Sequence, residues 1–384
     1  MFFRTTYAQC TSGDPVADAR KAVEIIGSGL AGFPAAMVVF FSSIEYDPAT
    51  LARAMHEAFP GVDTLGCTAT GEAVDARVLT GSVVAMAFAA EAFDYCEAAV
   101  VVDDEREPVG DGAYASVDAA MAHIGRGLGR SLLDLNYREY VGFVLGAPVA
   151  PSSEAVLERL GEVTDVIFVG GMAGENYTFL GTERVFFRGR AYHSATVIVL
   201  WKPRGGFSLL KTQAVNLTDH ALNITKADED KRIIWELNGQ PAASLYARLI
   251  GKEASALTAV DFDNNPLALL ADGDPFVRPA IQVVDGEGLR TYAAVRQGTR
   301  LYLTTAGDVL NTTAAAFKRK LDEEGPFSAV LHINCASRHH TLDKLGQTEA
   351  FGKLFAGIPS IAFSSYGEVY VGMVAMTSTM ILFK

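Results

Sequence analysis

One unit occurs three times in the chain and constrains the fold more than any other feature: strand, helix, strand, a loop with Gly-Glu, and strand. In the first copy, the apolar run Met37–Ser43 leads into a helix with Asp47 as its N-cap and Pro48 at its first position. The loop "TLGCTATGE" ends at Glu72, and the strand Ser82–Phe88 follows. The pattern predicts an α/β fold in this part of the chain.

The two later copies repeat this order with uneven spacing. The second consists of a strand from Tyr140, a helix near Ser153–Leu160, the loop "GGMAGEN" (Gly170–Asn176) and a strand at Ala195–Trp201. The third consists of the strand Ala329–Cys335, a helix near Gln347–Ala356, the segment "SIAFSSYGE" (Ser360–Glu368) and the strand Thr377–Phe383. A helical crossover joins parallel strands, whereas a short loop suits an antiparallel return, so we expect mixed β-sheets. The three copies are explained either by ancient duplication or by independent recurrence of the same βαβ pattern of strands, helices and turns.

A different segment, at about residues 218–324, separates the second and third copies. It opens with "DEDKRIIWELNGQPAASLYARLIG", which predicts one helix that Gly239 stops and a second that Pro241 starts. Short strands follow, and "DGEG" at Asp285–Gly288 predicts a β-hairpin. The expected fold is therefore α/β, in part α+β, with mixed β-sheets, flanking helices, three β-α-β-loop-β units and an inserted α+β segment.

Composition excludes several classes of protein. The chain has 384 residues, of which 49% are hydrophobic, and a formal net charge of −13, which would repel nucleic acid. No apolar run reaches the ~20 residues that a membrane helix needs, so we expect a cytoplasmic protein without membrane insertion. The four cysteines lack CxxC spacing and predict neither a disulfide framework nor a zinc site.

Polar residues and glycines gather just beyond the ends of the predicted strands. In sheets with helical crossovers, ligands bind outside the carboxyl ends of the parallel strands. The candidate ligand-binding residues at these ends are Cys67, Thr68, Thr70, Glu72, Gly171, Glu175, Asn176, Asn334, Cys335, Arg338, Ser364, Ser365, Tyr366 and Glu368. For any single Gly-Glu pair, a turn glycine and a capping glutamate are the commoner explanation. Three such loops favour a pocket.

Histidines and cysteines offer two further chemistries. Strand alternation puts His332 and Asn334 on one face, and His339 and His340 are expected in the next loop. A buried core histidine is the commoner role for His332. Cys67 or Cys335 with one of these histidines would form a nucleophile and base, with Glu72, Glu175 or Glu368 as acid or base, although a buried structural thiol is commoner. The sequence contains no phosphate-binding loop, HExxH helix or GxSxG elbow.

Several ordered motifs resemble the FIST family of bacterial sensory proteins. "TLGCTATGEAV" with "GSVVAMAF", and "GGMAGEN", resemble the FIST N-terminal domain. "NGQPAASLYARLIG", "PFVRPAIQVVDGEG" and "NCASRHHTLDKLGQTEAF…IPSIAFSSYGEVY" resemble the FIST C-terminal domain, and Arg278 in the second of these joins the candidate ligand-binding residues. The resemblance implies a FIST N-terminal domain over residues 1–215 and a FIST C-terminal domain over residues 216–384.

The resemblance also implies a function. FIST proteins are signal-input modules for small ligands, with amino acids and related metabolites proposed, and they act on histidine kinases, chemotaxis receptors or cyclic-di-GMP enzymes. With no transmitter domain in the chain, a separate signalling partner is expected. Some similar proteins bind haem, sense nitric oxide and regulate a histidine kinase. Haem needs an axial ligand, for which His332, His339, His340 and Cys335 are the candidates. A ligand sensor, a haem protein and a cysteine-dependent enzyme are the three hypotheses that the sequence leaves.

Overall fold

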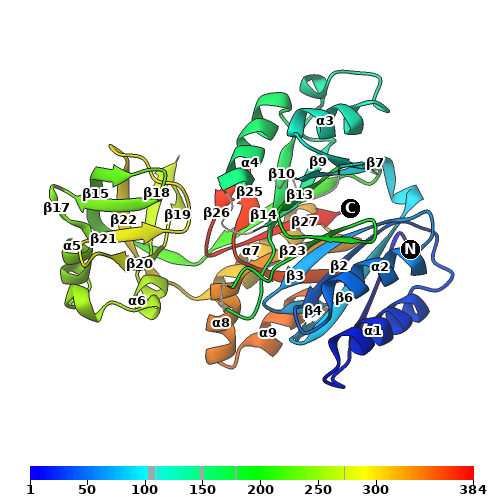
Figure 1. Cartoon of the computed structure of the whole chain (residues 1–384), viewed down its shortest axis with the longest axis horizontal. Coiled ribbons are helices and arrows are strands. Elements are labelled where there is room, and N and C mark those ends of the chain that lie inside the picture. The colour runs from blue at the N-terminus through cyan, green and yellow to red at the C-terminus, as the bar shows by residue number, and fades with distance from the viewer. Residues whose placement is uncertain (103–108, 111, 148–150, 178–179, 272) are drawn as a thin grey trace. The chain divides into compact units, whose positions relative to one another are not determined.

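The computed structural model describes residues 1–102, 109–110, 112–147, 151–177, 180–271 and 273–384 (Figure 1). The chain divides into two compact units, and both are discontinuous in sequence. Unit 1 comprises Met1–Thr212, Ala314–Met373 and Ser378–Lys384. Unit 2 comprises Gln213–Thr313 and Val374–Thr377. The family-domain boundary expected at 215/216 stays a prediction, because compact units and family domains are different divisions of the chain.

Unit 1 is built around three mixed β-sheets. The first sheet has the order β1 (Phe3–Gln9), β6 (Ser82–Ala89), β2 (Ala35–Ser43), β3 (Asp63–Ala69), β11 (Val185–Phe187), β12 (Arg190–Tyr192). The second has the order β26 (Gly372–Val374), β25 (Glu368–Tyr370), β10 (Ile167–Met172), β9 (Val141–Gly146), β13 (Ala195–Pro203), β7 (Phe93–Val102), β8 (Ala113–Tyr114). The third has the order β14 (Phe207–Gln213), β27 (Thr377–Phe383), β23 (Ala329–Cys335), β24 (Ser360–Ser365), β4 (Glu72–Val74), β5 (Arg77–Leu79).

Each sheet contains one copy of the repeated unit. In the first sheet β2 pairs with β3 in parallel and with β6 antiparallel. The same arrangement occurs for β9 with β10 and β13, and for β23 with β24 and β27. The expected mixed α/β fold with parallel crossovers and antiparallel returns is therefore confirmed.

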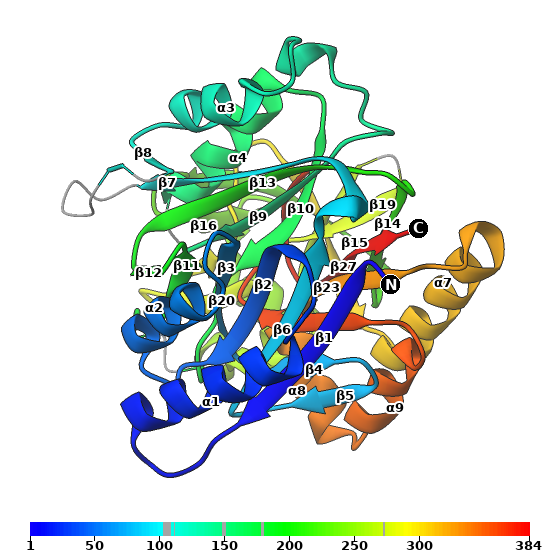
Figure 2. The ribbon, with the colours of Figure 1, turned by 90° about the vertical axis from the view of Figure 1, so that its right-hand side faces the viewer.

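Each sheet also receives a β-hairpin from a different copy. The hairpin β4–β5 leaves the first copy and pairs with β24 in the third sheet. The hairpin β25–β26 leaves the third copy and joins β10 in the second sheet, and β11–β12 leaves the second copy and joins β3 in the first. The exchange is cyclic, so each copy completes the sheet of another. Figure 2 shows β4 and β5 next to α9, which lies near the third sheet.

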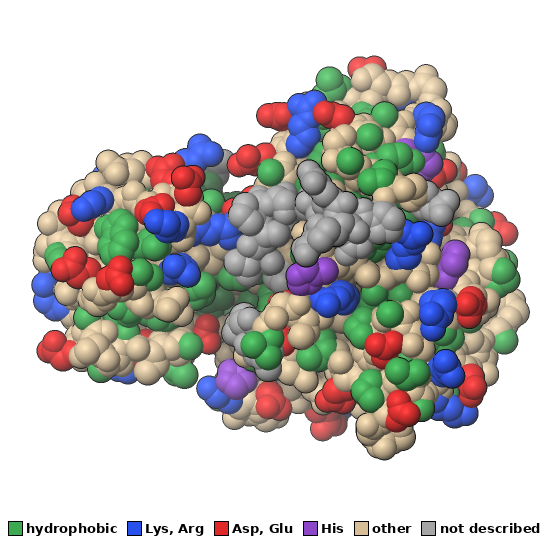
Figure 3. Space-filling model, viewed as in Figure 1, with side chains coloured by type: hydrophobic (Ala, Val, Ile, Leu, Met, Phe, Trp, Pro, Cys, Tyr) green, Lys and Arg blue, Asp and Glu red, His purple; other side chains and the backbone are tan. Residues whose placement is uncertain are grey.

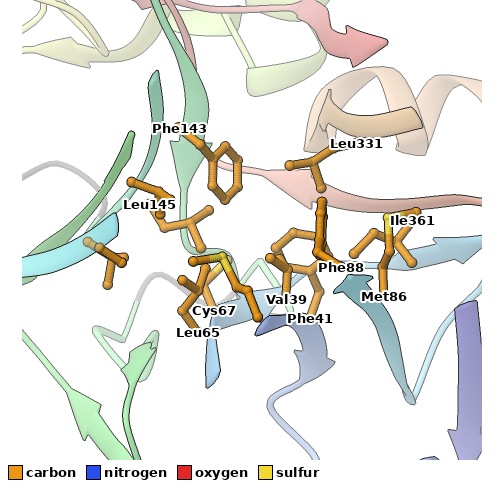
Figure 4. Packing of buried hydrophobic residues seen from close by; sticks show 14 of the residues in the cluster. Val39, Phe41, Leu65, Cys67, Met86, Phe88, Phe143, Leu145, Leu331 and Ile361 are labelled. Carbon is orange, nitrogen blue, oxygen red and sulfur yellow. The ribbon is translucent and has the colours of Figure 1, made fainter. Parts of the chain in front are cut away.

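A single hydrophobic core fills the space that the three sheets enclose. Figure 4 shows Val39 and Phe41 of the first sheet, Phe143 of the second and Leu331 of the third, with Phe88 also among them. All five side chains are almost completely buried. Because successive residues of a strand face opposite sides, the alternate residues of the same strands contact the helices outside.

The outer faces of the sheets are covered by helices. These are α1 (Pro15–Gly29) and α2 (Pro48–Ala58) on the first sheet, α3 (Val117–Gly125) and α4 (Pro151–Val163) on the second, and α7 (Val309–Glu324), α8 (Ala336–Lys344) and α9 (Thr348–Gly352) near the third. Short 3-10 turns occur at Ala90–Ala92, Leu132–Asp134 and Lys353–Phe355. The Asp47 carboxylate accepts a hydrogen bond from Thr50 N, which confirms the predicted cap and Pro48 start. The residues of α7 from Ala314 onward belong to unit 1.

Unit 2 has its own sheet and core. Its strand order is β19 (Asp274–Val277), β18 (Leu267–Ala271), β22 (Arg300–Ala306), β15 (Val215–Asp228), β16 (Ile233–Leu237), β21 (Gly288–Thr291), β20 (Ala280–Val284), and β17 (Gln240–Pro241) also pairs with β16. The helices are α5 (Ala242–Leu249), α6 (Ala259–Asn264) and a 3-10 turn at Ala254–Ala256. The predicted hairpin around Asp285–Gly288 is confirmed by the pairing of β20 with β21.

Two sequence predictions about helices are wrong. The segment before Gly239 is not helical but forms β16, because Ile233 and Ile234 pair with neighbouring strands and are buried in the core of unit 2. The helix after Pro241 is confirmed as α5. The "RHH" segment expected as a loop lies in α8, which starts directly after the strand that ends at Cys335.

Candidate functional site

The three Gly-Glu loops meet in unit 1. Thr70 N donates a hydrogen bond to Ser364 O (3.1 Å), Gly174 N donates to Thr68 O (2.9 Å), and Met172 N donates to Gly367 O (2.8 Å). We call residues 68–72, 172–176 and 364–368 the loop junction. Its glutamates Glu72, Glu175 and Glu368 have 1%, 0% and 0% exposure. Segments distant in the sequence thus form one buried polar cluster.

Strand register shows that only two of the three glutamates are equivalent. Glu72 opens β4 opposite Phe363, and Glu368 opens β25 opposite Gly171. The matching position of the third exchanged hairpin is Val185, opposite Cys67. Glu175 lies ten residues before Val185 in sequence, in a loop that the other two copies lack. The second Gly-Glu pair therefore has a different place in the fold, which the sequence repeat does not reveal.

Glu72 fastens the base of the exchanged hairpin β4–β5. Its Oε2 accepts hydrogen bonds from Ser82 Oγ (2.7 Å) and Ser82 N (3.2 Å). Burial raises the pKa of Glu72 to about 8, and the two bonds from Ser82 only partly oppose this. The carboxyl group is therefore mainly protonated at neutral pH.

Glu175 is held by hydroxyl groups. Tyr366 Oη lies 3.2 Å from Glu175 O and 3.4 Å from Glu175 Oε1, and Thr182 Oγ1 donates to Oε2 (3.3 Å). Tyr366 Oη also accepts a hydrogen bond from Tyr177 N (2.9 Å). Burial raises the pKa of Tyr366, so its hydroxyl stays protonated. The neighbouring Asn176 is exposed.

Arg338 is a buried cation in the first turns of α8. Its exposure is 2%, and its Nε donates a hydrogen bond to Asn334 Oδ1 (3.0 Å). Burial lowers the pKa of Arg338 to about 10, while Cys335 and Glu368 act in the opposite direction. Arg338 therefore remains charged at neutral pH and gives the cluster near Glu368 a positive centre.

A cavity of about 30 Å³ lies between the third sheet and helices α8 and α9. Its lining consists of Gly71, Glu72, Ala73, Asp75, Val78, His332, Asn334, His339, Leu342, Thr348, Phe351, Gly352, Phe355, Ser360, Ile361, Ala362, Phe363 and Ser364. Five predicted site residues are among them: Glu72, His332, Asn334, His339 and Ser364. A space of this size holds one or two water molecules.

Two histidines of the lining are engaged with serines. His332 Nε2 lies 2.6 Å from Ser378 Oγ, and burial lowers the pKa of His332 to about 3. His339 Nδ1 lies 2.8 Å from Ser364 Oγ, and burial also lowers the pKa of His339. Both imidazoles are therefore predominantly neutral at neutral pH. His340 is exposed, with its ring centroid 6.0 Å from that of Tyr177.

The residues as placed do not fit haem. A haem site needs an apolar slot as wide as the macrocycle, and pockets for ligands of drug size are roughly 300–1,000 Å³. The cavity beside His332 and His339 has about 30 Å³. The His332 ring also packs against Phe351 and Phe355, at centroid distances of 5.8 and 5.2 Å. For His332 to act as an axial haem ligand, its ring would have to separate from Phe351 and Phe355.

Three predicted ligand-binding residues of β3 and the loop after it lie outside the cavity lining. Cys67 lies in the central core among Leu65 and Val39, as Figure 4 shows, and burial raises its thiol pKa well above the ordinary value. Thr68 Oγ1 accepts a bond from Arg184 N, and Thr70 Oγ1 donates to Ser364 O.

Four further residues complete the account. Ser365 Oγ bonds the backbone of Met172 and Gly367, and Gly171 is required because a Cβ there would lie 2.7 Å from Ser365 Oγ. Cys335 is the N-cap residue of α8. Arg278 lies in unit 2, where its amide donates to Leu267 O (2.7 Å).

Sequence reasoning missed the helical side of the cavity. Leu342, Thr348, Phe351, Gly352 and Phe355 come from α8, α9 and the following turn. The apolar spacing of "EAFGKLF" was a signal for a helix that packs on a sheet. Nothing in the local sequence indicates which sheet that helix covers.

Metal-binding clusters and membrane-crossing helices are both absent from the part of the chain that the structure describes. No group of three or more His, Cys, Asp or Glu side chains there could hold a metal ion. None of the helices described there has the length and apolarity needed to cross a membrane. Figure 3 shows acidic and basic side chains interspersed over the face that it draws.

Comparison with known families gives the class of protein. A model of the FIST N domain matches residues 36–240, and a model of the FIST C domain matches residues 242–371. FIST domains are sensory domains that bind small ligands. The chain belongs to the FIST family.

No curated protein matches the chain. Two solved structures from Thermotoga maritima, PurL complexed with FGAR and PurLQS, are each 10% identical and cover 99% of this chain and 72% of their own. Their TM-scores are 0.21 and 0.18, and scores this low support no inference about fold or activity.

Proposed function

We propose that this protein is a sensor that binds a small ligand in the cavity beneath α8 and α9 and signals to a separate protein. The observation that supports the proposal best is the position of the cavity. Its lining takes Gly71 and Glu72 from one loop of the junction and Ser364 from another. A ligand there would therefore contact two of the loops that hold the sheets of unit 1 together.

The contacts around Ser364 give the cavity a route to the rest of unit 1. Ser364 O accepts bonds from Thr70 N and Thr70 Oγ1, and Ser364 Oγ contacts His339 of α8. A ligand that competes for His339 or Ser364 would change how α8 sits on the loop junction. Differential contacts of this kind are what a ligand needs to shift a conformational equilibrium.

A thermal-shift screen of amino acids and small metabolites, followed by calorimetric titration, tests the proposal. We expect at least one compound to raise the melting temperature, because a ligand that binds only the folded state stabilises it. Ser364→Ala should reduce that shift. Ser28→Ala, an exposed serine on α1, is the matched control and should retain it. A broad panel without any stabilising compound would contradict the proposal.

The partner belongs to the proposal as well. Membership of a sensory family supports a signalling role over an enzymatic one, and a histidine kinase or a cyclic-di-GMP enzyme is the partner class that we propose. Autophosphorylation of a histidine kinase from the same organism should change when the protein is added, and the ligand found in the screen should alter that change. Identical kinase rates with and without the protein would count against a kinase partner.

A further inference from the structure

We propose that the ligand of the cavity beneath α8 and α9 is an uncharged molecule with a flat ring and one hydrogen-bonding group. This inference rests on the proposed function, because it names the ligand class of the same cavity. This ligand class differs from the amino acids and related metabolites that the family resemblance suggests. A free amino acid carries two charges at neutral pH, whereas the proposed ligand carries none.

The lining has no cation to meet a carboxylate. Among the described residues that line the cavity there is neither a lysine nor an arginine. Arg338 is not in the lining, and its Nε donates a hydrogen bond to the Oδ1 of the lining residue Asn334. A carboxylate moved from water into this space would lose its hydration without gaining a counter-charge, which is unfavourable in a protein interior.

The acidic lining residues do not form a site for a cationic amine. Glu72 Oε2 is occupied by both donors of Ser82, and its pKa of about 8 leaves the carboxyl group mainly neutral at pH 7. Asp75 is exposed, and its carboxylate accepts bonds from Thr5 Oγ1 (2.9 Å) and Ser360 N (3.2 Å). The two histidines are predominantly neutral at that pH, and Asp75 is the one further acidic residue among the described lining residues.

Aromatic rings and short polar groups are what the lining does offer. The rings of His332, Phe351 and Phe355 pack together, and Ala73 and Ala362 add small side chains to the lining. Flat rings stack favourably on such aromatic surfaces. His339 and Ser364, whose side chains are bonded only to each other in the described contacts, provide one donor and one acceptor for a polar substituent.

The cavity must widen to admit such a molecule, and the proposal requires α9 and its following turn, which carry part of the lining, to shift. A benzene-sized ligand occupies a cavity of roughly 150 Å³, against about 30 Å³ here. Gly346 and Gly357, at φ +64° and +85°, flank α9 and its following turn, and added Cβ atoms there would meet open space. Glycine at both ends permits the backbone to change direction with little steric hindrance.

Benzamide and benzoate provide the test, because they share a ring and differ in charge at pH 7. L-Phenylalanine serves as the charged amino acid. Thermal shift and calorimetry should show that benzamide binds and raises the melting temperature by a few degrees, whereas benzoate and L-phenylalanine do not. Ala362→Leu, which fills the cavity, should weaken the affinity for benzamide at least tenfold. Ala119→Leu, at an exposed position of α3, should leave it unchanged.

The outcomes separate the two proposals. If Ala362→Leu fails to fold, Phe351→Leu replaces it and should weaken benzamide binding by removing one stacking ring. Binding of benzoate or L-phenylalanine that is lost in these variants would overturn the inference while the sensory function stands. Failure of all three probes would also overturn the inference, and the wider metabolite screen would then decide the proposed function alone.

Discussion

Glu72 Oε2 accepts hydrogen bonds from both the hydroxyl (2.7 Å) and the amide (3.2 Å) of Ser82, and these bonds close the base of a hairpin that belongs to another sheet. The chain leaves the first sheet at Ala69, forms β4–β5 in the third sheet and returns at Ser82. The position of the exchanged hairpin β4–β5 therefore depends on a contact made by the titratable carboxyl group of Glu72.

The first prediction concerns pH. In the folded protein the pKa of Glu72 is about 8, against 4.5 for an ordinary glutamate. The stability that the neutral carboxyl group contributes is complete below pH 4.5 and is lost as the pH rises through 8. One pKa unit corresponds to about 1.4 kcal/mol, so the loss should amount to a few kcal/mol.

Urea denaturation at pH 5, 7 and 9 of the wild type and of Glu72→Gln measures this effect. The Gln variant keeps an acceptor for Ser82 and cannot ionise, so the wild type should lose stability relative to it as the pH rises. Parallel pH profiles for the two proteins would mean that Glu72 is ionised in the fold at neutral pH.

The second prediction concerns Gly71, over which His339 lies. A Cβ at Gly71 would be 2.5 Å from His339 Cε1, closer than non-bonded atoms approach. Gly71→Ala should therefore destabilise the protein by about 1–3 kcal/mol through overpacking. Adding His339→Ala should recover part of that loss. If the single and double variants unfold at the same urea concentration, His339 does not press on the loop.

The third prediction concerns haem. Purified protein supplied with haem should give the absorption spectrum of free haem, because His332 and His339 are bonded to serines beside a cavity of about 30 Å³. A Soret band that shifts on reduction and on addition of nitric oxide would show that the cavity opens for the macrocycle. Loss of such a band in His332→Ala or His340→Ala would then identify the ligand.

The fourth prediction concerns the cysteine-dependent enzyme. Cys67 is completely buried and its thiol pKa is raised, so iodoacetamide should label it at neutral pH only as fast as the protein unfolds. Cys335 has 8% exposure and should also react slowly. Labelling of either residue within seconds in the native protein would restore the nucleophile hypothesis. Cys10, which is partly exposed, provides the internal reference.

The sequence predicts the local elements of unit 1 well but not their exchange. Strand Ala329–Cys335 and the Asp47–Pro48 helix start are set by neighbouring residues, so alternation and capping reveal them. The pairing of Glu72 with Phe363 joins residues 291 positions apart, and no local pattern encodes it. For Ile233–Leu237 the local sequence predicts the wrong element. Its neighbours in sequence favour a helix, but pairing with other strands of unit 2 makes it a strand.

The sequence likewise indicates some residues of the candidate site but not those whose role depends on tertiary packing. The sequence predicts polar residues just beyond the strand ends, because parallel strands bring their carboxyl ends to one edge. In the structure Thr68, Asn334 and Ser364 instead lie within the last residues of β3, β23 and β24. The roles of Phe351 and Phe355 depend on where α9 and its following turn settle on the third sheet, which only the structure shows. The burial of Arg338 likewise follows from tertiary packing rather than from the residues beside it.

A crystal structure of the protein with the tightest ligand from the metabolite screen tests the central claim most directly. We predict electron density for the ligand between β24 and helices α8 and α9, in contact with His339 and Ser364. Density for the ligand at any other place, with this cavity still closed at about 30 Å³, would contradict the account.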